Sequence, residues 1–224
     1  MAKIAVPSLN RTVKQNPAAL FIELINFIFV PVRLLIPQPI LRKIPLFRTN
    51  EDERSLIALS EMSGKALDIG CGNNRVMREY RVSGGEGLGV DVFDWGGPDL
   101  VVDNTAQLPF HSGAFDSISF IACLNHIPNR LEVLGEAHRL LKPGGRLLIT
   151  NLTPLVSALW HRIAFWDADQ RVRGMKEGEV WGFTDRELRD MVSKKGFRLT
   201  RKRSFMWGLN HLYIFERTNE DSVN

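Results

Sequence analysis

Beyond residue 50, the chain alternates short apolar runs with longer stretches in which apolar residues recur at helical spacing. The apolar runs predict strands over residues 65–69, 87–92, 100–102, 116–123 and 146–150. The helical patterns predict helices over residues 51–62, 74–80, 128–141 and 184–196. Strands that alternate with helices in this way are typical of an α/β domain built on a parallel sheet.

Two capping boxes and a hairpin complete this pattern. Asn50 with Glu53, and Thr184 with Glu187, have the spacing of capping boxes, so each pair is expected to open a helix. The stretches FRLTRKRSF and HLYIFER flank MWGLN and predict two antiparallel strands joined by a turn. The predicted domain therefore covers residues 50–217 and is followed by a tail over residues 218–224.

The segment before residue 50 has a different character. Residues 16–47 are strongly apolar and are interrupted by prolines at positions 31, 37, 39 and 45. The apolar run over residues 18–30 is too short to cross a bilayer, which takes about 20 residues. Glu23, Asn26 and Arg33 share one narrow face of a helix, and the rest of its surface is apolar. Residues 1–49 are therefore expected to form an apolar helical extension.

A helical surface that is so broadly apolar has to be covered by something. The domain's own sheet, a second subunit in a homodimer and the interface of a membrane are the three alternatives. The basic residues Arg33, Arg42, Lys43 and Arg48 favour anionic headgroups. A secretory signal is disfavoured, because the apolar run starts late and contains Glu23.

Composition narrows the function less than the pattern does. Apolar residues make up 44% and charged residues 24%, as in ordinary globular proteins. The net charge of +4 suits an acidic substrate, RNA or an anionic membrane and selects none of them. Cys71 and Cys123 form neither a CxxC motif nor a metal-ligand spacing, so we expect a reducing, cytoplasmic setting and no metal site.

The stretch ALDIGCGNN places two glycines directly after the first predicted strand. A tight turn without any ligand is one interpretation. A dinucleotide site needs the motif G-x-G-x-x-G, but Arg75 stands at its third glycine position, and the chain contains no P-loop motif. Asp91 ends the second predicted strand about twenty residues further on, where a carboxylate can accept both hydroxyls of a ribose.

Four stretches in order, ALDIGCGNN, GLGVDV, VVDNTAQLPFHSGAFDSISFIACLNHIPN and RLLKPGGRLLIT, resemble the class I S-adenosylmethionine-dependent methyltransferases. The resemblance is strongest to the small-molecule branch that includes ubiquinone-type methyltransferases, and it covers residues 65–150. It implies an α/β, Rossmann-like doubly wound sheet, mostly parallel with an antiparallel C-terminal hairpin. It also implies S-adenosylmethionine as the cofactor.

The same resemblance implies roles for individual residues. Asp68, Gly70 and Gly72 would line the methionine end of the cofactor. The ribose and adenine would meet Asp91, Val92 and either Asp103 or Asn104. Ala122 and Cys123 would form the floor beneath the sulfonium. The family's third loop glycine is replaced by Asn74, a residue that tolerates a positive φ better than most.

The acceptor is narrowed mainly by exclusion. His126 matches a histidine that the family often carries after the fourth strand, as a structural residue or as a base. Residues 124–128 lack the Asn/Asp-Pro-Pro-aromatic motif of enzymes that methylate base amines, so a nucleic acid acceptor is disfavoured. The insertion over residues 155–182 carries Trp160, His161, Trp166 and Trp181, which would form either a lid over an acceptor or a packing belt.

The sequence therefore predicts a methyltransferase that acts on a small-molecule or lipid-linked acceptor. It would work in the cytoplasm, and at the inner face of the membrane if the extension binds lipid. Two alternatives stay open. One is an RNA methyltransferase, which only the net positive charge of the chain favours, and the other is a cofactor-binding subunit without catalysis.

Overall fold

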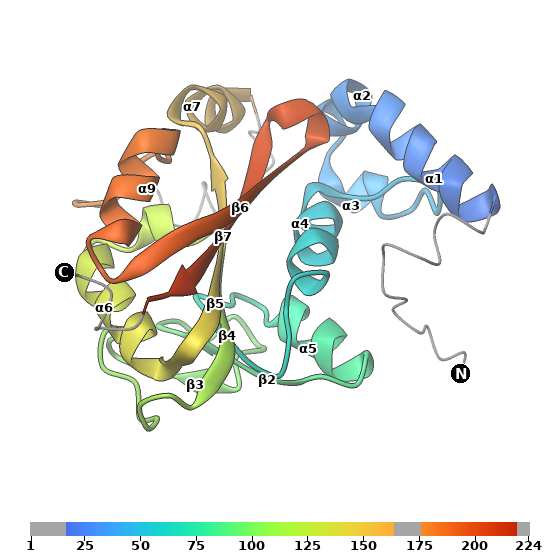
Figure 1. The fold of residues 1–224 in the computed structure, drawn as a ribbon. Coiled ribbons are helices and arrows are strands. Elements are labelled where there is room, and N and C mark those ends of the chain that lie inside the picture. Colours follow the sequence, from blue (N-terminus) through green and yellow to red (C-terminus); the bar gives the residue numbers. More distant parts are fainter. Residues whose placement is uncertain (1–16, 164–175, 219–224) are drawn as a thin grey trace.

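The computed structural model describes residues 17–163 and 176–218, and these residues form a seven-stranded sheet flanked by helices (Figure 1). The strand order is β3-β2-β1-β4-β5-β7-β6. The strands are β1 (Lys65–Ile69), β2 (Glu86–Asp91), β3 (Leu100–Val101), β4 (Phe115–Ile121), β5 (Leu141–Leu152), β6 (Phe197–Phe205) and β7 (Asn210–Arg217). Strands β1 to β5 pair in parallel, whereas β7 runs antiparallel to both β5 and β6. The predicted doubly wound sheet with its C-terminal hairpin is confirmed.

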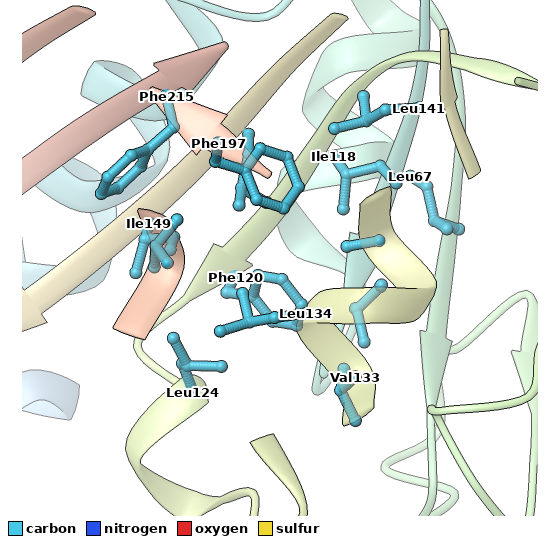
Figure 2. Packing of buried hydrophobic residues seen from close by; sticks show 14 of the residues in the cluster. Leu67, Ile118, Phe120, Leu124, Val133, Leu134, Leu141, Ile149, Phe197 and Phe215 are labelled. Carbon is cyan, nitrogen blue, oxygen red and sulfur yellow. The ribbon is translucent and has the colours of Figure 1, made fainter. Parts of the chain in front are cut away.

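Helices cover both faces of this sheet (Figure 1). Helices α4 (Asn50–Leu59) and α5 (Arg75–Val82) lie on one face, and α6 (Arg130–Leu140) and α9 (Asp185–Ser193) lie on the other. Alternate residues of a strand pack against the helices on opposite faces of the sheet, because successive side chains of a strand point to opposite faces. Leu147 and Ile149 join the core beneath α6 and α9 that Figure 2 shows, whereas Leu148 packs with Ile57 of α4.

The helix starts confirm one predicted capping box and correct the other. Thr184 and Glu187 cap each other reciprocally at the start of α9. At α4 the box consists of Thr49 and Asp52, one residue earlier than the predicted pair of Asn50 and Glu53. The shift has a tertiary cause, since the Glu53 carboxylate accepts a hydrogen bond from Arg33 instead, 20 residues earlier in the chain.

The N-terminal extension consists of α1 (Pro17–Ile28), α2 (Val30–Leu35) and α3 (Gln38–Leu41), which lie beside α4 (Figure 1). Its polar face is the buried face. Asn26 and Arg33 are each only 2% exposed. Arg33 donates to the carbonyl of Arg48 at 2.8 Å and to Glu53 at 3.0 Å, while Asn26 exchanges hydrogen bonds with the backbone of Leu46 and Arg48. Of the helices described, none combines the length and apolarity that crossing a membrane requires.

Candidate functional site

The residues singled out in the sequence meet at the carboxyl edge of the sheet. The glycine loop follows β1, Asp91 is the last residue of β2, and Ala122 and Cys123 follow β4. These three strands are neighbours and parallel, so their carboxyl ends lie side by side. Ligands of open α/β sheets bind beyond this edge, near the point where the strand order reverses. Here that point lies between β1 and β4.

The glycine loop turns through three left-handed positions, Gly70, Gly72 and Asn74, whose φ angles are +74°, +55° and +60°. Gly70 packs closely on the end of β4, because a Cβ there would lie 2.8 Å from the sulfur of Cys123. A Cβ at Gly72 would instead meet no atom within 4 Å. Gly70 therefore closes the turn against the protein, and Gly72 faces open space in which a ligand could approach the backbone.

Asp91 ties this loop to the neighbouring strand. Its Oδ2 accepts a hydrogen bond from the amide of Gly72 at 2.8 Å, and its Oδ1 accepts one from the amide of Phe93 at 3.1 Å. The residue is 7% exposed, whereas the adjacent Val92 and Phe93 are 57% and 59% exposed. A carboxylate has about four lone-pair sites, so Asp91 retains capacity for hydroxyl donors beside an exposed apolar surface.

Asn74 does more than tolerate the turn. Its side-chain amide donates to the carbonyl of Gly97 at 3.0 Å and to Asp99 at 2.7 Å. Asp99 also accepts from the amide of Gly89 and from Arg81, both at 2.8 Å. This cluster holds the loop against β2, and its members outside the loop could not be assigned from the sequence.

Asp68 is a buried carboxylate beneath the loop. It is 1% exposed, and the hydroxyl of Ser119 donates to its Oδ1 at 2.6 Å. Burial raises the pKa of Asp68 to about 7, and the negative charge of Asp91 raises it too, against the effect of the Ser119 hydrogen bond. A cationic group bound next to Asp68 would favour the ionised carboxylate and lower its pKa again. The site therefore suits a positively charged part of a ligand.

The two cysteines beside this carboxylate are not suited to nucleophilic chemistry. Burial, followed by the negative charges of Asp68 and Asp91, raises the pKa of both Cys71 and Cys123 above the usual range of a thiol. Both thiols therefore stay protonated at neutral pH, and the Cys123 thiol donates to the carbonyl of Ile69 at 3.0 Å.

Ala122 carries backbone strain at the end of β4. Its φ is +57°, a left-handed conformation that costs an L-residue other than glycine about 1 kcal/mol. Its amide donates to the hydroxyl of Thr150 at the end of β5, at 2.8 Å. Strain of this kind is concentrated at functional sites, so its position directly after β4 supports the choice of this edge.

His126 has an acidic partner that the sequence did not reveal. Its Nδ1 lies 3.2 Å from Oε2 of Glu179, whose side chain is 1% exposed. The two segments are joined by backbone pairing as well, since the amide of Val180 donates to the carbonyl of Asn125 at 2.9 Å. The contact spans 53 residues, and no spacing in the sequence indicates it.

The remaining predicted site residues either are exposed or lie partly outside the described residues. Asp103 and Asn104 are both exposed in the segment after β3, and the structure does not choose between them. Trp160 and His161 belong to α7 (Pro154–Ile163), but their side chains and all of Trp166 lie outside the described residues. Trp181 is 41% exposed. Among the residues described, no group of three or more His, Cys, Asp or Glu side chains could hold a metal ion.

The basic run in β6, which is the feature that RNA would use, is paired within the protein. Arg201 and Arg203 project to one side and both form ion pairs with Glu61. Lys202 projects to the other side and pairs with Asp185 at 2.5 Å. Two carboxylates thus offset most of the charge of the three basic residues, which favours a structural role for the run over phosphate binding.

Fold and site together define a Rossmann-like methyltransferase. The sequence pattern of a family described as a methyltransferase domain matches residues 42–202, which is well over half of the chain. The chain belongs to this family and, within it, to the class I S-adenosylmethionine-dependent methyltransferases.

Curated relatives point to the same class. The chain is 25% identical over 130 residues to a ubiquinone/menaquinone biosynthesis C-methyltransferase of Brucella canis, a match that covers 51% of this chain and 48% of the relative. It is 29% identical over 129 residues to the enzyme of that name from Cereibacter sphaeroides, covering 51% and 52%. The chain thus spans about half the length of the curated relatives that it matches.

Solved structures show the same fold. An S-adenosylmethionine-dependent methyltransferase from Methanosarcina mazei superposes with a TM-score of 0.54 at 21% identity, covering 73% of this chain and 98% of that one. A 1,6-didemethyltoxoflavin-N1-methyltransferase from Burkholderia thailandensis superposes with a TM-score of 0.54 at 20% identity, covering 75% and 77%. The latter structure holds S-adenosylhomocysteine and its small-molecule substrate.

Proposed function

We propose that this protein transfers the methyl group of S-adenosylmethionine to an apolar small-molecule acceptor, of the kind that is linked to a lipid. The observation that carries the cofactor site is the meeting of Gly72 and Asp91 at the carboxyl edge, next to open space above the loop. The acceptor class rests on the apolar extension at the same edge and on the similarity to quinone C-methyltransferases.

In this proposal the cofactor lies across the ends of β1, β2 and β4. Asp68 compensates the charge of its ammonium group, and the backbone at Gly70 and Gly72 allows the methionine end to come close. Asp91 accepts the ribose hydroxyls and Val92 packs on the adenine, whose amino group meets Asp103 or Asn104. Ala122 and Cys123 lie beneath the sulfonium. The exposed surface of Val92 supports this placement, since an adenine ring would cover it.

When bound, S-adenosylmethionine supplies an activated methyl group, so the protein's main task is to orient the acceptor and to exclude water. A hydroxyl or carbon acceptor must also lose a proton. We assign that proton to Nε2 of His126. The carboxylate of Glu179 lies 3.2 Å from Nδ1, so it would hold a proton on that atom and make Nε2 the accepting nitrogen of the ring.

Methyl-labelled cofactor tests the proposal. The purified protein is incubated with that cofactor and an extract of its source cells, and the extract is then divided into organic and aqueous phases. We expect label in the organic phase, its loss with Asp91→Ala, and its retention with Asp94→Ala, which removes an exposed carboxylate of the following loop. Label confined to the aqueous phase would exclude a lipid-linked acceptor. Binding of the cofactor without transfer to either phase would instead favour a subunit without catalysis.

A further inference from the structure

The outward face of the N-terminal extension is apolar. Residues 23, 26, 30 and 33 recur at helical spacing, and of these Asn26, Val30 and Arg33 are each 2% exposed. The residues on the other side of α1 are Leu20, Phe21, Leu24, Phe27 and Ile28, and each is between 52% and 60% exposed. We call these five residues, together with Trp207, the outer apolar face. Val32 and Leu35 continue it along α2, at 46% and 65% exposure.

This arrangement is the reverse of an ordinary surface helix, which turns its apolar stripe to the core and its polar residues to water. Here the hydrogen bonds of Asn26 and Arg33 need the buried side, because both residues satisfy backbone carbonyls and Arg33 also pairs with Glu53. No other part of the described chain covers the outer apolar face, as its exposure shows. The packing that holds the extension in place therefore leaves the apolar side for a partner.

Trp207 extends the face from a different part of the chain. It lies in the turn between β6 and β7, where Met206, Trp207 and Gly208 all have positive φ angles. A φ of +59° is a genuine outlier for so bulky a residue. Its Nε1 donates to the carbonyl of Phe27 at 2.8 Å, and the two rings lie 6.2 Å apart while Trp207 stays 53% exposed. The strained turn thus presents an indole beside α1, and indoles favour the membrane interface.

The outer apolar face lies at the same end of the molecule as the candidate site. Asn210, directly after the turn, pairs with Leu152 at the carboxyl end of β5. The extension is fastened to the start of α4, and there Asp52 pairs with Arg75, the first residue of the helix that follows the glycine loop. In Figure 1, α2, the turn of the hairpin and α7 all lie toward the upper end of the view. On α7, Leu155 and Leu159 are exposed as well, at 80% and 57%.

Charge distinguishes among the partners that could cover this face. Residues 1–48 contain seven of the 29 lysines and arginines but only one of the 25 acidic residues. Of the four basic residues among these that the structure describes, Arg33, Arg42 and Arg48 pair with Glu53, Glu51 and Glu23, whereas Lys43 forms no ion pair with a described residue. Arg42 and Lys43 are exposed directly after α3. A second copy of this chain would bring a second set of basic residues to the interface, which disfavours a dimer through this face. An anionic surface would be attracted, at about 1 kcal/mol per basic residue near it.

We propose that the outer apolar face inserts into the interface of an anionic lipid bilayer and holds the carboxyl edge of the sheet toward the membrane. The helices lie in the plane of the interface, with Phe21, Leu24 and Phe27 among the acyl chains and Trp207 at the level of the headgroups. The inference adds a partner to the proposed function but rests on its own observations, because none of these residues belongs to the proposed cofactor site. Lipid binding and cofactor binding can therefore fail independently.

Sedimentation with lipid vesicles tests the proposal on the full chain. We expect the protein to bind vesicles of mixed phosphatidylcholine and phosphatidylglycerol, and to bind pure phosphatidylcholine more weakly. Added salt should weaken binding to the mixed vesicles that contain phosphatidylglycerol. Phe21→Ser and Leu24→Ser should each weaken partition by about tenfold, because each removes one large apolar side chain from the bilayer. Val82→Ser, at a 74% exposed position at the far end of α5, is the matched control and should bind like the original protein.

A second measurement does not depend on destabilising changes to the extension. Acyl chains that carry bromine should quench part of the tryptophan fluorescence of the vesicle-bound protein, and Trp207→Phe should remove that part. Calorimetric titration with S-adenosylmethionine shows whether each variant keeps its cofactor site. Equal vesicle binding by Phe21→Ser, Leu24→Ser and Val82→Ser would overturn the proposal. The proposal would also be overturned if the protein did not bind vesicles and instead formed dimers that were lost in Phe21→Ser. The partner of the outer apolar face would then be a second copy of the chain.

Discussion

The backbone amide of Gly72 donates to Oδ2 of Asp91 at 2.8 Å, across 19 residues of sequence. This contact joins the glycine loop after β1 to the end of β2, which are the two parts of the chain that the cofactor has to bridge. Asp91 therefore shapes the loop, and in the proposed function it also accepts the ribose hydroxyls of the cofactor.

Replacing Asp91 with alanine should weaken S-adenosylmethionine binding about a hundredfold, because hydrogen bonds to a charged group contribute roughly 3 kcal/mol. Asp91→Asn should lose less, since its amide oxygen can still accept from Gly72. Isothermal titration calorimetry measures both affinities, with Asp94→Ala as the control. An affinity unchanged in Asp91→Ala would show that the ribose binds elsewhere.

Asp68 should make stability depend on pH. Its pKa is about 7 in the folded protein and near 3.8 in the unfolded chain, so folding favours the protonated acid. Its contribution is complete below about pH 4 and is lost as the pH rises toward 7, by about 4 kcal/mol in all. Denaturant unfolding across this window should show that decline, and Asp68→Asn should flatten it. Parallel curves for the two proteins would contradict the assignment.

Binding of S-adenosylmethionine should release a proton from the carboxyl group of Asp68. A bound ammonium favours ionised Asp68, which is mostly protonated in the free protein at about pH 6. The binding enthalpy at that pH should therefore change with the ionisation enthalpy of the buffer, and this dependence should disappear in Asp68→Asn. A buffer-independent enthalpy for the original protein would mean that the ammonium lies away from Asp68.

Ala122→Gly should stabilise the protein, by up to about 1 kcal/mol, because glycine adopts a φ of +57° without steric cost. The same change at Ala137, which is buried inside α6, should destabilise by about 1 kcal/mol or more, since glycine is a poor helix former. The urea midpoint should therefore rise in Ala122→Gly and fall in Ala137→Gly, each relative to the original protein. Destabilisation by both would indicate that the Ala122 side chain makes packing contacts that outweigh its strain.

Arg33 should be essential for holding the extension. It is 2% exposed and donates to two backbone carbonyls and to Glu53. Arg33→Ala leaves those acceptors buried without a donor, so we expect a loss of about 3–5 kcal/mol. Arg42→Ala breaks an exposed ion pair with Glu51 and should cost less than about 1 kcal/mol. Thermal unfolding compares the two variants, and similar melting temperatures would refute the role assigned to Arg33.

Much of the candidate site followed from the order of motifs. The sequence alone brings Asp68, Gly70, Gly72 and Asp91 to one edge of the sheet, because they lie at or directly after the ends of consecutive strands whose parallel pairing aligns those ends. The boundary of α4 was wrong by one residue, since Asn50 with Glu53 and Thr49 with Asp52 both have suitable side chains. Local spacing could not choose between them, and the distant Arg33 did.

The sequence by itself determined the fold class, the order of the strands and the edge of the sheet where the candidate site residues gather, because these depend on periodicity and on spacing along the chain. It missed the length of β5, which begins at Leu141 and not at residue 146. It also showed that Glu23, Asn26 and Arg33 share a face of the extension. Only the tertiary structure decided that this polar face is the buried one, since the carbonyls of Leu46 and Arg48 and the carboxylate of Glu53 have to be satisfied there. The pairing of His126 with Glu179 was decided in the same way. Contacts between residues this far apart depend on how the elements pack, and hydrophobic periodicity carries no information about that.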